Sequence, residues 1–180
     1  MQSLINYDPR DPWMVDMPFE SKSISSPIKI GYTKETLGET LHPAVDKALE
    51  NAIEALRDAG YILEEIVLPN FQDASDFSAK TLFGELKALH EKDYKTLGSE
   101  NFNLVADNYF EIISPFEGED LLLGMAKRSY FFREWNLFFR QYPLVLTPFL
   151  LYPTYKWNRD TEGLEGTKEV LAGMFYAHTM

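Results

Sequence analysis

The stretch that decides the fold is residues 27–69, PIKIGYTKETLGETLHPAVDKALENAIEALRDAGYILEEIVLP. Apolar residues alternate with polar or small ones over 28–33, and this period of two predicts a strand. Apolar side chains then recur at three- and four-residue spacing from Pro43 to Gly60, which predicts a helix over 43–59. The β pattern returns over 61–67. The stretch therefore predicts one strand–helix–strand unit.

Two strands joined by a helix of this length are most simply parallel, with a right-handed crossover. A third strand is predicted over 143–147, because the apolar run 144–146 lies between two prolines and is typical of a strand buried on both faces of a parallel sheet. The expected fold class is α/β, with a mixed or parallel sheet flanked by helices.

Apolar spacing predicts further helices over about 72–92, 102–113 and 119–141, and another from 167 onward. The helix over 119–141 is apolar around much of its circumference. It should therefore be buried on two sides or expose an apolar face that lacks its partner. Between the last strand and the last helix, residues 149–166 are expected to form an aromatic-rich loop.

Two segments are predicted along the 180 residues. Residues 1–26 contain Pro9, Pro12 and Pro18 without hydrophobic periodicity, and we expect an extended arm that lies over another surface. Residues 27–180 are expected to form one α/β unit.

Composition excludes several function classes. The net charge of −11 would repel a phosphate backbone or an anionic membrane, so neither nucleic acid nor a membrane is an expected partner. There is no cysteine, and the three histidines lack metal-ligand spacing, so we expect neither a metal site nor a cofactor. The N-terminus has no signal-peptide pattern, which favours a cytoplasmic protein.

Few residues form a recognisable catalytic pattern. The only adjacent serine pair, Ser25-Ser26, has no flanking glycines and is interpreted as part of a linker. The acidic clusters are interpreted as solvated faces rather than as paired catalytic carboxylates. His90 lies beside Glu91 and Asp93, but a lone histidine near a helix C-terminus more often compensates the helix dipole. The common nucleotide, hydrolase-elbow and zinc-protease motifs are absent.

The loop after the third predicted strand is the main candidate for a binding site. Phe149, Tyr152 and Trp157 gather just beyond the carboxyl end of that strand, where α/β sheets place ligand clefts. A substrate pocket and an ordinary core both fit this pattern. We name these three residues as candidate substrate-binding residues.

Several short motifs, in their order along the chain, resemble the amidase signature family. They are Asp8-Pro9-Arg10-Asp11-Pro12-Trp13, Pro27-Ile28-Lys29-Ile30-Gly31, His42-Pro43-Ala44-Val45, Ala59-Gly60-Tyr61, Glu64-Glu65, Leu68-Pro69 and Leu144-Val145-Leu146-Thr147-Pro148. Each is short, but the succession runs across nearly the whole chain. It is similar to the part of those enzymes that lies downstream of the catalytic signature. Residues 92–142 carry the resemblance only through the aromatic helix.

The resemblance implies hydrolysis of carboxamide C–N bonds by a serine nucleophile, a second serine whose peptide bond is cis, and a lysine that relays the proton. The glycine- and serine-rich stretch that carries both serines does not occur here, and no lysine matches the catalytic position. We therefore assign no catalytic residue. We expect a sequence cut at both ends and, taken alone, inactive as an amidase.

The resemblance thus implies a fragment that shapes the pocket for a small-molecule amide. Where the family has a second threonine and prolines, this chain has Phe149-Leu150-Leu151, which suits an apolar or aromatic substrate. Two alternatives stay open. One is a non-catalytic small-molecule binding or interaction module, and the other is part of the amidase subunit of a glutamyl-tRNA amidotransferase. A homodimer is a further option.

Overall fold

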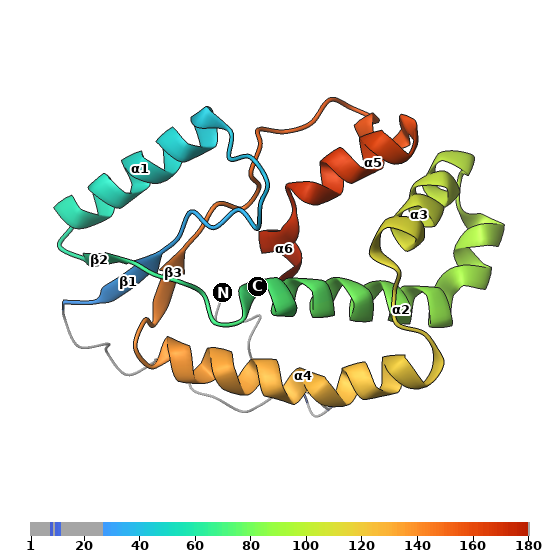
Figure 1. Ribbon diagram of the computed structural model, residues 1–180, viewed down its shortest axis with the longest axis horizontal. Helices are drawn as coiled ribbons and strands as arrows, with labels where there is room; N and C mark the ends of the chain where they lie inside the picture. The colour runs from blue at the N-terminus through green and yellow to red at the C-terminus, as the bar shows by residue number, and fades with distance from the viewer. Residues whose placement is uncertain (1–7, 9, 12–26, 180) are drawn as a thin grey trace.

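The computed structural model describes residues 8, 10, 11 and 27–179. Along this part of the chain, strands and helices alternate first and helices then dominate (Figure 1). The elements are β1 (Lys29–Tyr32), α1 (Pro43–Asp58), β2 (Ile62–Glu65), α2 (Phe71–Leu97), α3 (Glu100–Ile113), α4 (Gly118–Phe139), β3 (Leu144–Leu146), a 3₁₀ helix (Arg159–Thr161), α5 (Gly163–Ala172) and α6 (Phe175–Thr179).

The three strands form one open parallel sheet in the order β2-β1-β3. Ile30 in the central strand pairs with Leu63 on one side and with Leu144 on the other. The α/β fold class, the parallel pairing of the first two strands and the third strand in the same sheet are all confirmed. Helix α1 makes the crossover between β1 and β2 that the sequence pattern of residues 27–69 predicts.

Helices cover both faces of the sheet. Figure 1 shows α1 on one face and the C-terminal end of α4 on the other. Helix α1 buries Leu49 and Ile53, the inward positions of its amphipathic stripe. On the opposite face, Val145 of β3 packs in a cluster with Trp135 and Phe138 of α4. The sheet is therefore the middle layer of a three-layer arrangement.

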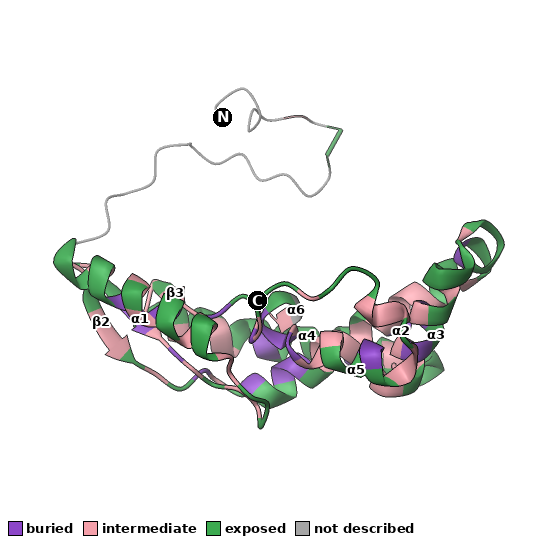
Figure 2. Ribbon diagram, turned by 90° about the horizontal axis from the view of Figure 1, so that it is seen from above, coloured by how far each residue is buried: buried purple, intermediate pink, exposed green. Residues whose placement is uncertain are grey.

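A small hydrophobic cluster joins the sheet to the helices. Its buried members are Leu68, Phe71, Leu151, Phe175 and Tyr176. They come from the segments that follow β2 and β3, from the first turn of α2 and from α6. Figure 2 shows many of the buried positions gathered around α6. We call these five residues the hub, because chain segments far apart in the sequence meet there.

Helix α4 is packed along one side and exposed along the rest. Phe131 is 6% exposed and its ring lies 4.7 Å from that of Phe77 in α2, whereas the next residue, Phe132, is 55% exposed. Tyr130, Leu137 and Phe139 are exposed as well. Of the two alternatives stated for this helix, the structure bears out the exposed apolar face.

Three boundary predictions were wrong. Helix α2 continues to Leu97, five residues beyond the predicted end, so His90 lies well inside the helix and does not compensate a C-terminal dipole. Helix α5 begins at Gly163 rather than at 167, and the 3₁₀ helix further shortens the predicted loop over 149–166.

Except for residues 8, 10 and 11, the predicted arm over 1–26, with Ser25 and Ser26, lies outside the described residues.

Candidate substrate site at the carboxyl edge of the sheet

The segments that leave the carboxyl ends of β1 and β2 line an open cavity of about 470 Å³. Parallel strands all end at the same edge of a sheet, and open α/β sheets bind ligands beyond that edge. The cavity is lined by Glu35, Leu37, Gly38, Val67, Leu68, Asn70, Phe71, Gln72 and Asp73. It is the candidate site to which the fold itself points.

The turn after β1 is held by hydrogen bonds between side chains and backbone. The backbone N–H of buried Thr33 donates to the Leu146 carbonyl over 3.2 Å, which continues the pairing of β1 with β3. Thr33 Oγ1 accepts from the Glu35 N–H at 3.1 Å. The Glu35 carboxylate in turn accepts from the N–H of Leu37 at 2.9 Å. These bonds fix the backbone that forms one wall of the cavity.

Two residues of the cavity wall have left-handed backbone conformations. Leu37 has φ 51° and Asn70 has φ 48°. Asparagine tolerates this region, but for leucine it costs on the order of 1–2 kcal/mol because Cβ approaches the following carbonyl oxygen. Such backbone strain clusters at functional sites. Of the two residues, only Leu37 is strained in this way.

Tyr176 stabilises the same wall of the cavity. Its hydroxyl donates to the Glu35 carbonyl oxygen at 2.8 Å, while its ring belongs to the buried hub. Burial raises the pKa of this phenol well above its usual range, so the hydroxyl stays protonated and remains a donor. The hub therefore supports the cavity through both packing and a hydrogen bond.

The three residues that the sequence proposed occupy three different environments. Phe149 follows β3 at the carboxyl edge and is 73% exposed. Tyr152 packs on the hub, with its ring centroid 6.2 Å from that of Tyr155. Trp157 is 91% exposed and lines a separate depression with Arg159 and Val170. Of the two interpretations left open, pocket and core, Tyr152 fits the core, whereas Phe149 and Trp157 are exposed, and none of the three lines the carboxyl-edge cavity.

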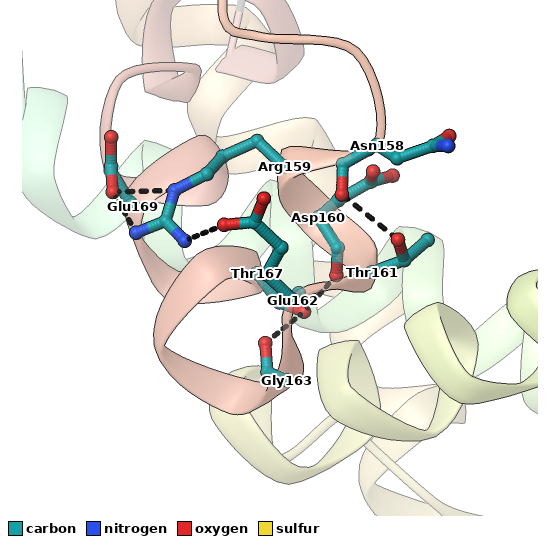
Figure 3. Close-up of polar contacts among 8 residues, drawn as sticks. All are labelled: Asn158, Arg159, Asp160, Thr161, Glu162, Gly163, Thr167 and Glu169. Atoms are coloured by element: carbon teal, nitrogen blue, oxygen red, sulfur yellow. Dashed lines mark hydrogen bonds and ion pairs between the residues drawn. The ribbon is translucent and has the colours of Figure 1, made fainter.

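Polar contacts hold the segment next to Trp157 in place (Figure 3). The Arg159 guanidinium binds Glu169, through Nε at 2.9 Å, and Glu162 through Nη1 at 2.5 Å. Buried Thr167 donates to the Asp160 carbonyl oxygen at 2.8 Å and accepts from the Asn108 amide at 2.9 Å. These contacts fasten the 3₁₀ helix to α5 and to α3. These contacts stabilise the conformation of the segment and do not by themselves indicate a catalytic or binding role.

Sequence reasoning missed the residues that wall the cavity. Asn70 carried a usable signal, because asparagine directly before an apolar-periodic run marks a helix N-terminus. Leu37 carried no such signal, since a leucine in the sequence does not indicate a left-handed backbone.

Among the described residues, the structure contains no group of three or more side chains suited to hold a metal ion. No helix in this part of the chain is long and apolar enough to cross a membrane.

Comparison with known proteins identifies the family. An indoleacetamide hydrolase of Bradyrhizobium diazoefficiens is 29% identical over 166 residues, which are 92% of this chain and 32% of the hydrolase. An indoleacetamide hydrolase of Bradyrhizobium japonicum is 27% identical over 166 residues, covering 92% of this chain and 36% of the hydrolase. A glutamyl-tRNA(Gln) amidotransferase subunit of Methanosarcina acetivorans is 36% identical over 78 residues, which are 41% of this chain and 16% of that protein.

This chain therefore spans about a third of the length of the two hydrolases. The profile of the family described as Amidase matches residues 1–162, which is well over half of the chain. The resemblance inferred from the ordered motifs is confirmed, and the chain belongs to the amidase family.

Proposed function

We propose that this chain forms the substrate-recognition part of a carboxamide hydrolase and does not carry the serine–serine–lysine triad itself. The observation that carries the proposal is the cavity at the carboxyl edge of the sheet. Phe149 does not line it but is exposed on the segment that follows β3. Its support from relatives is the similarity of 92% of the chain to hydrolases named for indoleacetamide. The proposed substrate class is therefore a small aromatic carboxamide.

The chemistry of the edge suits such a ligand. Phe149 and Val67 are exposed apolar side chains on segments that follow β3 and β2. An aromatic ring can stack on Phe149, which contributes about 0.5–1.5 kcal/mol beyond the area that it buries. Gln72 and Asp73, at the start of α2, supply polar groups to the cavity wall. The carboxamide end of the ligand needs such groups, because an unpaired buried amide is costly.

The reaction proposed for the whole enzyme is acyl transfer through a serine. The serine oxygen attacks the amide carbonyl carbon, the C–N bond breaks, and the nitrogen leaves as ammonia after it takes up a proton. Water then attacks the acyl-enzyme and releases the acid. In this scheme the described residues bind both the aromatic end and the carboxamide end of the ligand, which holds the carbonyl in place for the attack.

The amidotransferase alternative has weaker support. Similarity to the amidotransferase protein extends over 41% of the chain, and the net charge of −11 disfavours a transfer RNA partner. The proposed partner is a small molecule. Neither nucleic acid nor a membrane is proposed as a partner, and homodimer formation stays a prediction.

Inactivity of the isolated chain is tested by ammonia release. The purified 180-residue chain is incubated with indole-3-acetamide, and we expect no turnover above the buffer rate. The reason is that no nucleophile–base pair is assigned in this sequence. Turnover that disappears in a Ser25→Ala/Ser26→Ala double variant would overturn both the proposed inactivity and the interpretation of that pair as a linker.

Substrate recognition is tested by calorimetric binding of indole-3-acetamide to the same chain. Phe149→Ala should weaken binding about tenfold, which corresponds to ~1.4 kcal/mol. The matched control is Phe102→Ala, which removes an exposed phenylalanine from α3 and should leave the affinity unchanged. If the amide does not bind, or if both variants bind it as the unchanged chain does, the carboxyl edge is not the recognition site.

A further inference from the structure

A second cavity, of about 380 Å³, lies between α2 and α4. It is distinct from the carboxyl-edge cavity, with which it shares no lining residue. Half of its ten lining residues are aromatic: Phe77 of α2 and Phe131, Phe132, Trp135 and Phe139 of α4. The volume is within the range of about 300–1,000 Å³ that is typical of small-molecule sites.

The aromatic walls follow from the spacing along α4. Arg128, Phe132, Trp135 and Phe139 are separated by four, three and four residues, so they lie along one stripe of the helix. The ring centroids of Trp135 and Phe139 are 5.8 Å apart, with the planes inclined by 46°. Rings arranged in this way present both faces and edges, which suits contact with another aromatic ring.

One cation completes this stripe. The guanidinium carbon of Arg128 lies 4.9 Å from the centroid of the Phe132 ring, within the range of a cation–π contact. In the described part of the chain Arg128 has no carboxylate within salt-bridge distance, whereas Arg133, on the same helix, has one, Glu134 at 3.5 Å. The Arg128 guanidinium can therefore pair with an anionic group of a ligand.

We propose that this cavity binds a planar aromatic carboxylate, with the ring against Phe132 and Trp135 and the carboxylate on the guanidinium of Arg128. A planar guanidinium matches a carboxylate through two parallel hydrogen bonds and keeps its charge at every relevant pH. The acidic surface elsewhere repels anions, so binding depends on the guanidinium of Arg128 and on the aromatic walls. Lys127, whose Nζ lies 5.9 Å from the centroid of the Phe131 ring, is a second cation nearby. The inference rests on the geometry of α2 and α4 and does not require the proposed hydrolase function.

The experiment uses phenylacetate and its uncharged counterpart phenylacetamide, and it follows tryptophan fluorescence and binding heat with the 180-residue chain. Phenylacetate should bind more tightly than the amide. Arg128→Gln should weaken phenylacetate at least tenfold, to the affinity of the amide, and Trp135→Phe should remove most of the fluorescence change. Arg133→Gln is the matched control and should leave both affinities unchanged.

Three results would overturn the inference. They are no binding of phenylacetate at millimolar concentration, equal affinity for acid and amide, and an Arg128→Gln variant that binds the acid as the unchanged chain does. Arg128 is exposed, so its replacement should leave the thermal unfolding midpoint unaltered, and this measurement excludes misfolding. Phe149→Ala should not affect the acid. Failure of this site is therefore distinguishable from failure of the carboxyl-edge site.

Discussion

Glu64 connects the three strands through its two carboxylate oxygens. Oε1 accepts from Lys29 Nζ of β1 at 2.7 Å, and Oε2 accepts from the hydroxyl of Tyr142, which lies just before β3, at 2.8 Å. The hydrogen bond from Lys29, followed by that from Tyr142, lowers the pKa of Glu64 below its ordinary value. The same contact raises the pKa of Lys29. One side chain thus links β2 to the central strand and to the opposite edge.

The sign of the resulting pH dependence follows from the direction of the Glu64 shift. A carboxyl whose pKa is lower in the folded state stabilises the fold above its unfolded pKa of about 4.3, and this contribution is lost as the pH falls through the folded pKa. Glu64→Gln should therefore be less stable than the unchanged chain at pH 7, and the difference should vanish in strong acid. Urea unfolding at several pH values measures it.

The control for this prediction is Glu111→Gln, which changes an exposed carboxylate of α3. Its difference from the unchanged chain should vary little with pH. High salt should reduce the Glu64 effect, because the pair is partly exposed and therefore screened. A Glu64→Gln variant whose deficit is the same at pH 7 and in strong acid would show that the carboxylate charge is not what stabilises the sheet.

At the scale of elements, α2 approaches the segment just before α4 closely because α2 has a glycine at the contact. A Cβ on Gly84 would lie 2.5 Å from the carbonyl oxygen of Phe116 and 3.0 Å from Leu121 Cδ1. The Phe116 segment cannot simply move away, since its N–H donates to the Lys80 carbonyl at 3.1 Å. Glycine at this position therefore allows α2 to contact the backbone of the segment that leads into α4.

Gly84→Ala should destabilise the protein, although the same change inside a helix normally stabilises it by about 1 kcal/mol. The new methyl group meets backbone rather than a flexible side-chain end, and overpacking of this kind costs roughly 1–3 kcal/mol. Ala88→Gly, at an exposed position of the same helix, shows the ordinary propensity cost of about 1 kcal/mol. A rise in the free energy of unfolding for Gly84→Ala would contradict the close approach.

Elements were predictable from the sequence where local rules agree. Pro43 and Gly60 mark the two ends of the predicted helix α1, and the alternation of apolar and polar residues indicates β1. The strand–helix–strand unit therefore followed from residues 27–69 alone. Helix α2 was predicted too short because residues 93–97 are mostly charged or polar. They remain helical because α3 packs beside them, as the ion pair of Lys95 with Asp107 at 2.5 Å shows. Such tertiary support is invisible in a local pattern.

The candidate site was predictable only in part, for a related reason. The carboxyl edge of the sheet was the expected place, because that rule needs only the topology. The residues that wall the cavity were missed, since they depend on the left-handed backbone at Leu37 and on the meeting of two loops. Tyr152 and Phe149 have the same aromatic character in the sequence, and only packing decides that the first lies on the hub and the second in solvent.

At the scale of the whole molecule, the hub joins the segments that follow β2 and β3 to α2 and α6. Leu151 is its most enclosed member, with no exposed surface. Its carbonyl accepts from the His42 N–H at 2.9 Å, at the start of α1, and its N–H donates to the Gly173 carbonyl at 3.1 Å, between α5 and α6. One residue therefore ties both ends of the fold to the same cluster.

Leu151→Ala should lower the free energy of unfolding by about 2–5 kcal/mol, the cost of a large-to-small change in a packed core. Because the hub serves both the sheet and the helices, hydrogen exchange of the α1 and α2 amides should accelerate together and by a similar free energy. Leu97→Ala, at an exposed position, should change stability by less than about 0.5 kcal/mol. If exchange accelerates in α2 alone, the helices and the sheet unfold independently, and the hub does not unite them.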